Sequence, residues 1–112
     1  MMKAVPYAKE VFCMGLKNAL GITQVPEFSF FPTGDFTAVR IQCENQEGEI
    51  FWDKTFQSEN TFGFFYDGRP LADGEKVTYR IGLYNGEHFG GFSDNSWFEM
   101  GIQPENFQKK MI

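Results

Sequence analysis

The chain has 112 residues, a length that fits a single domain with its own hydrophobic core. Its formal charge of −5 and pI near 4.8 argue against nucleic acid or an anionic membrane as partner, because both are bound mainly through basic patches. Fourteen phenylalanines indicate a core filled by bulky aromatic side chains. No run is long enough to predict a membrane span, and Pro6, Lys9 and Glu10 interrupt any signal-peptide core. We therefore expect a soluble, cytoplasmic protein.

The first part of the chain gives one ambiguous element and one clear strand. Residues 5–16 fit either a short helix or an added strand, and the pattern does not decide between them. Residues 27–31 lie between Pro26 and Pro32, which commonly bound strands in this way. This segment is therefore predicted to be the first regular strand.

Apolar and polar residues alternate over residues 37–43, which places Val39, Ile41 and Cys43 on one face of a strand and Arg40 and Gln42 on the other. The sequence NQEG that follows is typical of a turn, and residues 49–52 then resume an extended run. Cys43 is therefore expected in the core. A disulfide between Cys13 and Cys43 stays open, because sequence does not show whether the two Cα atoms come close enough.

The second half repeats this pattern. Residues 61–66 predict a strand that bends at Gly63, and residues 97–102 predict the last strand. Residues 77–84 predict the clearest half-buried strand, with Thr78, Arg80 and Tyr84 on the face opposite its apolar residues. Glycine-containing turns separate these runs at intervals typical of a sandwich. The sequence therefore predicts an all-β chain folded as a single antiparallel β-sandwich, fibronectin type III- or immunoglobulin-like, with about six or seven strands. The residues expected to share its core are Val39, Ile41, Tyr79, Ile81 and Leu83.

Several short motifs follow one another in an informative order. They are NALGI (18–22), PEFSF (26–30), TAVRI (37–41), the strand end FWD (51–53), YDGRPL (66–71), VTYRIGLYNG (77–86) and WFEMGI (97–102). In this order and spacing the chain resembles the fibronectin type III-like β-sandwich near the N-terminus of bacterial α-L-rhamnosidases, from about residue 16 onward. Phe30 and Phe92 depart from the pattern, because the family often has tryptophan at both positions.

This resemblance implies a non-catalytic accessory domain of a larger glycoside hydrolase. Residues 1–15 would form an N-terminal extension, residues 16–103 the sandwich, and residues 104–112 the start of a connection to a further domain. The intact parent would hydrolyse terminal α-L-rhamnose with inversion, through two carboxylates in a downstream helical barrel. The partners implied are the downstream domains of the same polypeptide and, through the parent, a rhamnose-containing glycan.

The residues themselves suggest no catalytic group, metal site or cofactor. Most acidic residues lie beside turn glycines or on solvent-facing positions, and turn formation and solubility explain them better than an acid–base pair does; examples are Asp67, Asp73, Glu87 and Asp94. His88 is the only histidine, and it is predicted to lie in a glycine-rich loop without a nucleophile beside it. One histidine and two cysteines at these spacings do not predict a zinc site.

Sugar binding is the one ligand function for which the sequence offers candidate residues. Trp52, Tyr84 and Trp97 each have a nearby carboxylate or amide side chain, which is the combination that stacks on a pyranose ring and binds its hydroxyls. The alternative is that these aromatic side chains fill a core or a domain interface, as is usual for aromatic residues in strands. The competing function is therefore a free-standing carbohydrate-binding or adhesion module. An enzyme complete in this chain is a third class, for which no acid–base pair can be named.

Overall fold

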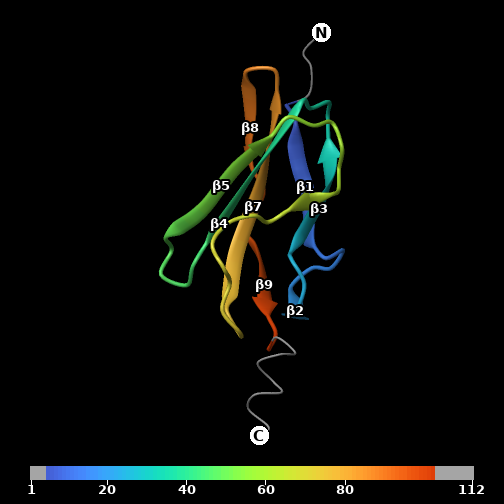
Figure 1. The fold of residues 1–112 in the computed structure, drawn as a ribbon. Helices are drawn as coiled ribbons and strands as arrows, with labels where there is room; N and C mark the ends of the chain where they lie inside the picture. The colour runs from blue at the N-terminus through green and yellow to red at the C-terminus, as the bar shows by residue number, and fades with distance from the viewer. Residues whose placement is uncertain (1–4, 103–112) are drawn as a thin grey trace, which may run out of the picture.

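The computed structural model describes residues 5–102, in which nine strands form two sheets packed face to face and no helix occurs (Figure 1). The expected all-β sandwich is confirmed, with more strands than the six or seven predicted. In chain order the strands are β1 (Tyr7–Cys13), β2 (Ala19–Ile22), β3 (Glu27–Thr33), β4 (Ala38–Glu44), β5 (Ile50–Phe56), β6 (Phe64–Phe65), β7 (Lys76–Asn85), β8 (His88–Phe92) and β9 (Ser96–Met100).

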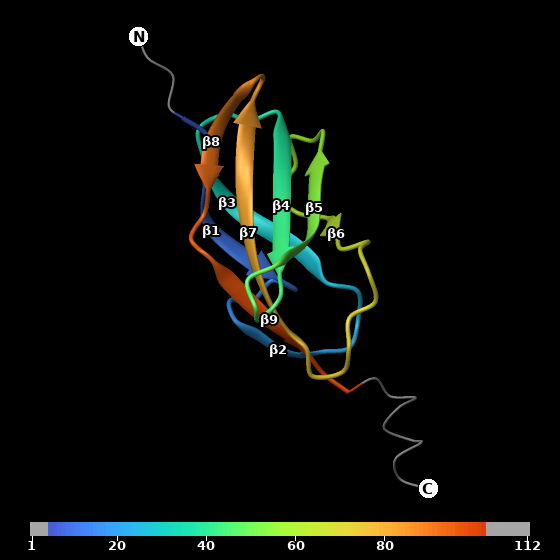
Figure 2. The same cartoon turned by 90° about the vertical axis from the view of Figure 1, so that its left-hand side faces the viewer.

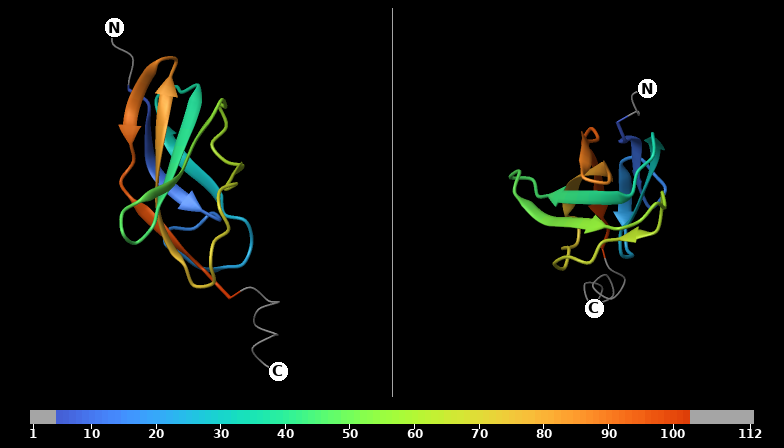
Figure 3. Two further views of the ribbon diagram at one scale, coloured as in Figure 1. Left: turned by 60° about the vertical axis from the view of Figure 1, so that its left-hand side comes forward. Right: turned by 90° about the horizontal axis from the view of Figure 1, so that it is seen from above.

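The smaller sheet has the order β1-β3-β6, and the larger has the order β2-β9-β7-β4-β5 with β8 paired to β7. Figure 2 shows β8, β7, β4 and β5 side by side, with β1 and β3 behind them. The view from above in Figure 3 shows the two layers edge on. All strand pairs are antiparallel except β2 and β9, which run parallel. That one pair departs from the expected purely antiparallel sandwich.

The strands beyond the six or seven predicted lie where the alternation of apolar and polar residues is weak or short. The ambiguous segment at residues 5–16 contains β1, which pairs with β3 and so completes the smaller sheet. Of the strand predicted at residues 61–66, only Phe64 and Phe65 pair, after a bend at Gly63, whose φ is +86°. The glycine-rich stretch that contains His88 is a strand, β8, rather than a loop.

β8 and β9 occupy successive halves of the same edge of β7. β8 pairs with Gly82 to Asn85, and β9 pairs with Lys76 to Tyr79. Ser93 bridges the break, since its backbone N–H donates to the Ile81 carbonyl at 2.8 Å and its hydroxyl accepts from the Ile81 N–H at 3.1 Å. The buried backbone of Ile81 therefore keeps both hydrogen bonds where the ladder changes strand.

The core lies between the two sheets and is rich in aromatic rings. Phe28 of the smaller sheet contacts Trp52, Tyr79 and Phe98 of the larger, at centroid distances of 6.0, 5.0 and 6.0 Å. The predicted core is confirmed, because all five of its members are at most 1% exposed: Val39, Ile41, Tyr79, Ile81 and Leu83. The apolar residues of the alternating pattern in β4 and β7 therefore lie on the inner face of the larger sheet.

Both cysteines are buried free thiols, so the disulfide that the sequence left open is not formed. Burial raises the pKa of Cys13 to about 12 and raises that of Cys43 as well, since a thiolate loses its hydration in the core. The expectation that Cys43 is a core residue is confirmed. Both thiols act here as small apolar side chains.

Candidate functional site

The three aromatic residues singled out from the sequence lie on two different faces of the larger sheet. Trp52 is on the inner face of β5, whereas Tyr84 and Trp97 lie on the outer face of the larger sheet. On that face Trp97 pairs with Thr78, near the opposite end of β7 from Tyr84. The structure therefore separates Trp52 from the other two, and a role of any of them in sugar or domain contacts stays a prediction.

Trp52 belongs to the core, with 8% of its surface exposed. Its ring packs against Phe28 and Tyr66, and its Nε1 donates a 2.9 Å hydrogen bond to Oδ1 of Asp67. Asp67 also pairs with Lys54. The hydrogen bonds from Lys54, which has the larger effect, and from Trp52 hold the pKa of the Asp67 carboxyl below its usual range. The indole thus anchors the turn that begins at Asp67.

A polar network crosses the outer face from β5 through β4 to β7. Arg40 donates to both oxygens of Asp53, from Nε at 2.9 Å and from Nη2 at 2.7 Å. Gln42 donates to Oδ2 of Asp53 at 2.8 Å and accepts from Nε of Arg80, also at 2.8 Å. The Arg40 guanidinium lowers the pKa of Asp53, and Asp53 in turn raises that of Arg40. Bidentate pairing fixes the planes of these side chains on the sheet.

Three aromatic rings continue this face over β7 and β8, and we call Tyr84, Phe89 and Phe92 the outer aromatic strip. The Phe89 ring lies 4.7 Å from that of Tyr84 and 5.0 Å from that of Phe92. The guanidinium of Arg80 stacks over Phe92 at 4.5 Å, and Nη1 of Arg40 donates to the Tyr84 hydroxyl at 3.5 Å. Both guanidinium groups thus lie at the strip, Arg80 over Phe92 and Arg40 beside Tyr84.

At the end of the sandwich where β9 finishes, an open groove of about 340 Å³ lies between the start of β3 and the turn after β6; we call it the end groove. Val25, which is 56% exposed, lies along it, and Ile102, which is 46% exposed, follows β9 at the same end. The other apolar side chains along the groove are Pro26, Tyr66, Pro70, Leu71 and Met100.

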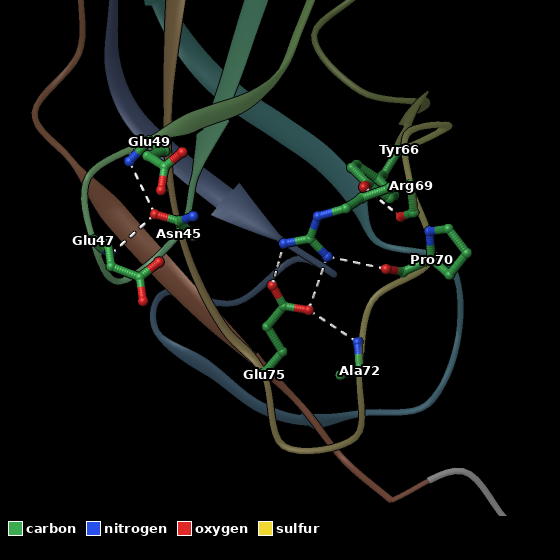
Figure 4. Close-up of polar contacts among 8 residues, drawn as sticks. All are labelled: Asn45, Glu47, Glu49, Tyr66, Arg69, Pro70, Ala72 and Glu75. Carbon is green, nitrogen blue, oxygen red and sulfur yellow. Dashed lines mark hydrogen bonds and ion pairs between the residues drawn. The ribbon is translucent and has the colours of Figure 1, made fainter.

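One wall of the end groove is held by its own hydrogen bonds, as Figure 4 shows. The Tyr66 hydroxyl donates to the Arg69 carbonyl at 2.5 Å. Arg69 donates to the Pro70 carbonyl at 3.0 Å and pairs with Glu75 through two bonds of 3.1 and 2.6 Å. Glu75 also accepts from the N–H of Ala72 at 2.9 Å. A turn fixed in this way presents its apolar side chains with little entropy left to lose on contact.

A second turn at the same end is fixed by one side chain. The Oδ1 atom of Asn45 accepts from the backbone N–H groups of Glu47 and Glu49, at 3.0 and 2.9 Å (Figure 4). This is an Asx-type turn, and it joins β4 to β5. It turns the chain without adding an apolar side chain to the end groove.

Within 5–102, no group of three or more His, Cys, Asp or Glu side chains could hold a metal ion. The three carboxyl groups with shifted pKa values there are Asp53, Asp67 and Glu75, and all three are lowered, first of all by a hydrogen-bonded Arg or Lys. His88 lies exposed on β8. No helix in this part of the chain could cross a membrane.

Sequence reasoning placed Arg40 and Arg80 on the outward face of their strands, but missed the network and the strip that they join. Phe89 was not singled out, and Phe92 was noted only as a departure from the family pattern, because glycines surround both and their stretch was predicted to be a loop. The sequence did predict the bend at Gly63 and the alternation of β7, including the position of Tyr84. These features belong to single strands, so they do not show which side chains meet across strands.

Solved structures of three enzymes have the same fold. Those structures are an α-L-rhamnosidase from Dictyoglumus thermophilum (TM-score 0.81, 20% identity, 96% of this chain), one from Aspergillus terreus (0.76, 22%, 91%) and one from Streptomyces avermitilis complexed with L-rhamnose (0.73, 17%, 87%). This chain covers only 14%, 13% and 11% of those chains, respectively. No curated protein sequence matches it.

The sequence family model described as "Rha78A-like, N-terminal immunoglobulin domain" matches residues 8–104, which is most of the chain and includes all of the sandwich strands except the first residue of β1. The resemblance inferred from the motifs is thereby confirmed, and β1 falls inside the matched domain. The chain therefore belongs to the family of N-terminal immunoglobulin domains of Rha78A-like proteins.

Proposed function

We propose that this chain is the non-catalytic N-terminal accessory domain of a bacterial α-L-rhamnosidase-like glycoside hydrolase, and that it packs against and positions the domains that follow it. The observation that carries the proposal is the family match over residues 8–104. The small share of the solved rhamnosidase chains that this chain covers supports it, since the rest of such a protein leaves room for a catalytic domain. The intact parent would hydrolyse terminal α-L-rhamnose from glycosides.

The chemistry of the described residues agrees with a non-catalytic role. A glycosidase needs one carboxylic acid whose pKa is raised, so that it can protonate the leaving oxygen, and a second carboxylate across the scissile bond. The shifted carboxyl groups between residues 5 and 102 are instead lowered by cationic partners, which keeps them ionised. They serve as ion-pair and turn groups.

The end groove supports packing against a following domain. The exposed Val25 and the half-buried Leu71 offer apolar surface at the end where β9 finishes. Burying a side chain of this size completely stabilises an interface by roughly 1.5–3 kcal/mol. Because the wall that carries Leu71 is already fixed by the Arg69–Glu75 pair, little of that gain is lost to ordering the turn.

The first test is the mass of the natural gene product, by immunoblot of source cells with an antibody to this chain. A band many times larger than 12.9 kDa supports the accessory-domain function. A band at 12.9 kDa would contradict it and favour the free-standing carbohydrate-binding or adhesion module.

The packing is then tested in the complete protein with the variants Val25→Asp and Leu71→Asp. We expect either variant to lower the Tm of the complete protein more than it lowers the Tm of the isolated chain, because only the complete protein has the interface. Leu20→Asp is the matched control, since Leu20 is 67% exposed and does not line the groove. Equal losses in both proteins would contradict packing through the end groove.

A further inference from the structure

We propose that the outer aromatic strip, together with Arg40 and Arg80, is a binding platform for neutral pyranose sugars. The sugar ring would stack on Phe89 and Tyr84, and its hydroxyls would accept hydrogen bonds from the guanidinium groups at the edge of the strip. The site lies on the outer face of β4, β7 and β8, which faces the reader in Figure 2. It is separate from the end groove, so it adds a ligand to the proposed accessory domain.

One glycine makes room for the central ring of the strip. Phe89 lies directly over Gly82 of β7, where an added Cβ would come within 2.5 Å of two Phe89 ring atoms. The far end of the Phe89 ring therefore lies against the strand backbone, and 37% of Phe89 is exposed. Exposed aromatic surface attracts the weakly positive C–H groups on one side of a pyranose ring, because the face of an aromatic ring is negative.

A local irregularity brings two phenylalanines onto the same face. Phe89 and Phe92 are three residues apart, so a regular strand would place them on opposite faces. The pairing register with β7 shifts between Gly82 and Tyr84, and Gly91 has a φ of +88°, which only glycine adopts readily. As a result the two rings lie 5.0 Å apart on one surface.

The hydrogen-bonding groups beside the strip are already in place. Gln42 accepts from Nε of Arg80, and the Arg80 plane lies on Phe92, which fixes its orientation. Among residues 5–102, Arg80 forms no ion pair, and no hydrogen bond holds its two terminal nitrogens. Those nitrogens can donate to sugar hydroxyls without breaking an existing bond.

The size and chemistry of the strip favour a sugar over a protein partner. A phenylalanine carries about 200 Å² of surface, so the exposed 37% of Phe89 is roughly 70 Å². A stable protein interface needs about 800 Å² from each partner and an apolar centre. Here guanidinium groups lie over Phe92 and beside the Tyr84 hydroxyl, and Asp53 already neutralises Arg40. A small ligand with an apolar face and a hydroxyl rim matches this surface.

The test is a titration of the ¹⁵N-labelled 112-residue chain with neutral oligosaccharides, including a rhamnose-terminated one, followed by NMR. We expect saturable shifts at the Gly82 amide and the Arg80 Nε–H. Phe89→Ala should weaken binding about tenfold, the scale on which removal of a stacking ring acts. Phe89→Tyr should keep binding, because it keeps the ring. Gly82→Ala should weaken binding by displacing that ring.

Phe62→Ala is the matched control, since Phe62 is 66% exposed and lies outside the strip; it should leave binding unchanged. The proposal is overturned if no neutral oligosaccharide gives saturable shifts on this face, or if Phe89→Ala and Phe62→Ala bind sugar equally. Neither result bears on the gene-product mass or on the end-groove variants. The two proposals therefore fail separately.

Discussion

Two buried tyrosines differ in a way that predicts opposite effects of the same substitution. Tyr79 is 1% exposed, and its hydroxyl has no hydrogen-bond partner among residues 5–102. Tyr66 is 8% exposed, and its hydroxyl donates to the Arg69 carbonyl. We expect Tyr79→Phe to raise the free energy of unfolding and Tyr66→Phe to lower it.

The magnitudes follow from what each substitution removes. Burying a hydroxyl without a partner costs roughly 1–3 kcal/mol, and phenylalanine at position 79 keeps the ring contacts with Phe28 and Phe98 at 5.0 and 6.0 Å. Tyr79→Phe should therefore stabilise the chain by about 1 kcal/mol. Loss of a hydrogen bond at Tyr66 costs about 1 kcal/mol, since water can reach the exposed Arg69 turn. The difference of about 2 kcal/mol is a roughly thirtyfold change in the unfolding equilibrium.

Urea unfolding at neutral pH, followed by tryptophan fluorescence, measures both variants against the parent chain. The slope m should not change, so the shift in midpoint reports stability directly. Destabilisation by Tyr79→Phe would refute the reasoning, because it would mean that the hydroxyl has a partner in solution. Ser96 is the candidate for that partner, since it opposes the rise that burial causes in the pKa of Tyr79.

Three further outcomes are expected. Gly68→Ala should lower the free energy of unfolding by about 1–3 kcal/mol in urea, because the new Cβ would lie 2.6 Å from the Tyr66 hydroxyl and 2.7 Å from Cδ1 of Trp52; an unchanged midpoint would contradict this packing. Stability should fall above about pH 9, where the thiols of the unfolded chain ionise while burial keeps Cys13 and Cys43 protonated in the fold, and urea midpoints at pH 8 and 10.5 test the sign. Ellman's reagent should label neither thiol in the native chain and both in urea, and native labelling would contradict their burial.

The sequence predicted well those strands that have one face in the core. β4 and β7 alternate over their whole length, so parity alone separated Val39 and Ile81 from Arg40 and Arg80. β1 was ambiguous because its register with β3 shifts between Ala8 and Glu10, which breaks the alternation. The parallel pairing of β2 with β9 joins distant parts of the chain, and no local pattern reports it.

The sequence predicted less of the candidate site than of the strands. Parity cannot say which side chains meet across strands, because that depends on register, and a slip of one residue would turn Arg80 to the other face. The outer aromatic strip also depends on the register shift between β7 and β8. It depends on Gly82 as well, because a side chain there would occupy the space of the Phe89 ring. A glycine of this kind looks in the sequence like a weak point in a good strand. The structure instead gives it a definite role, because any larger residue would displace the ring on which the proposed sugar site depends.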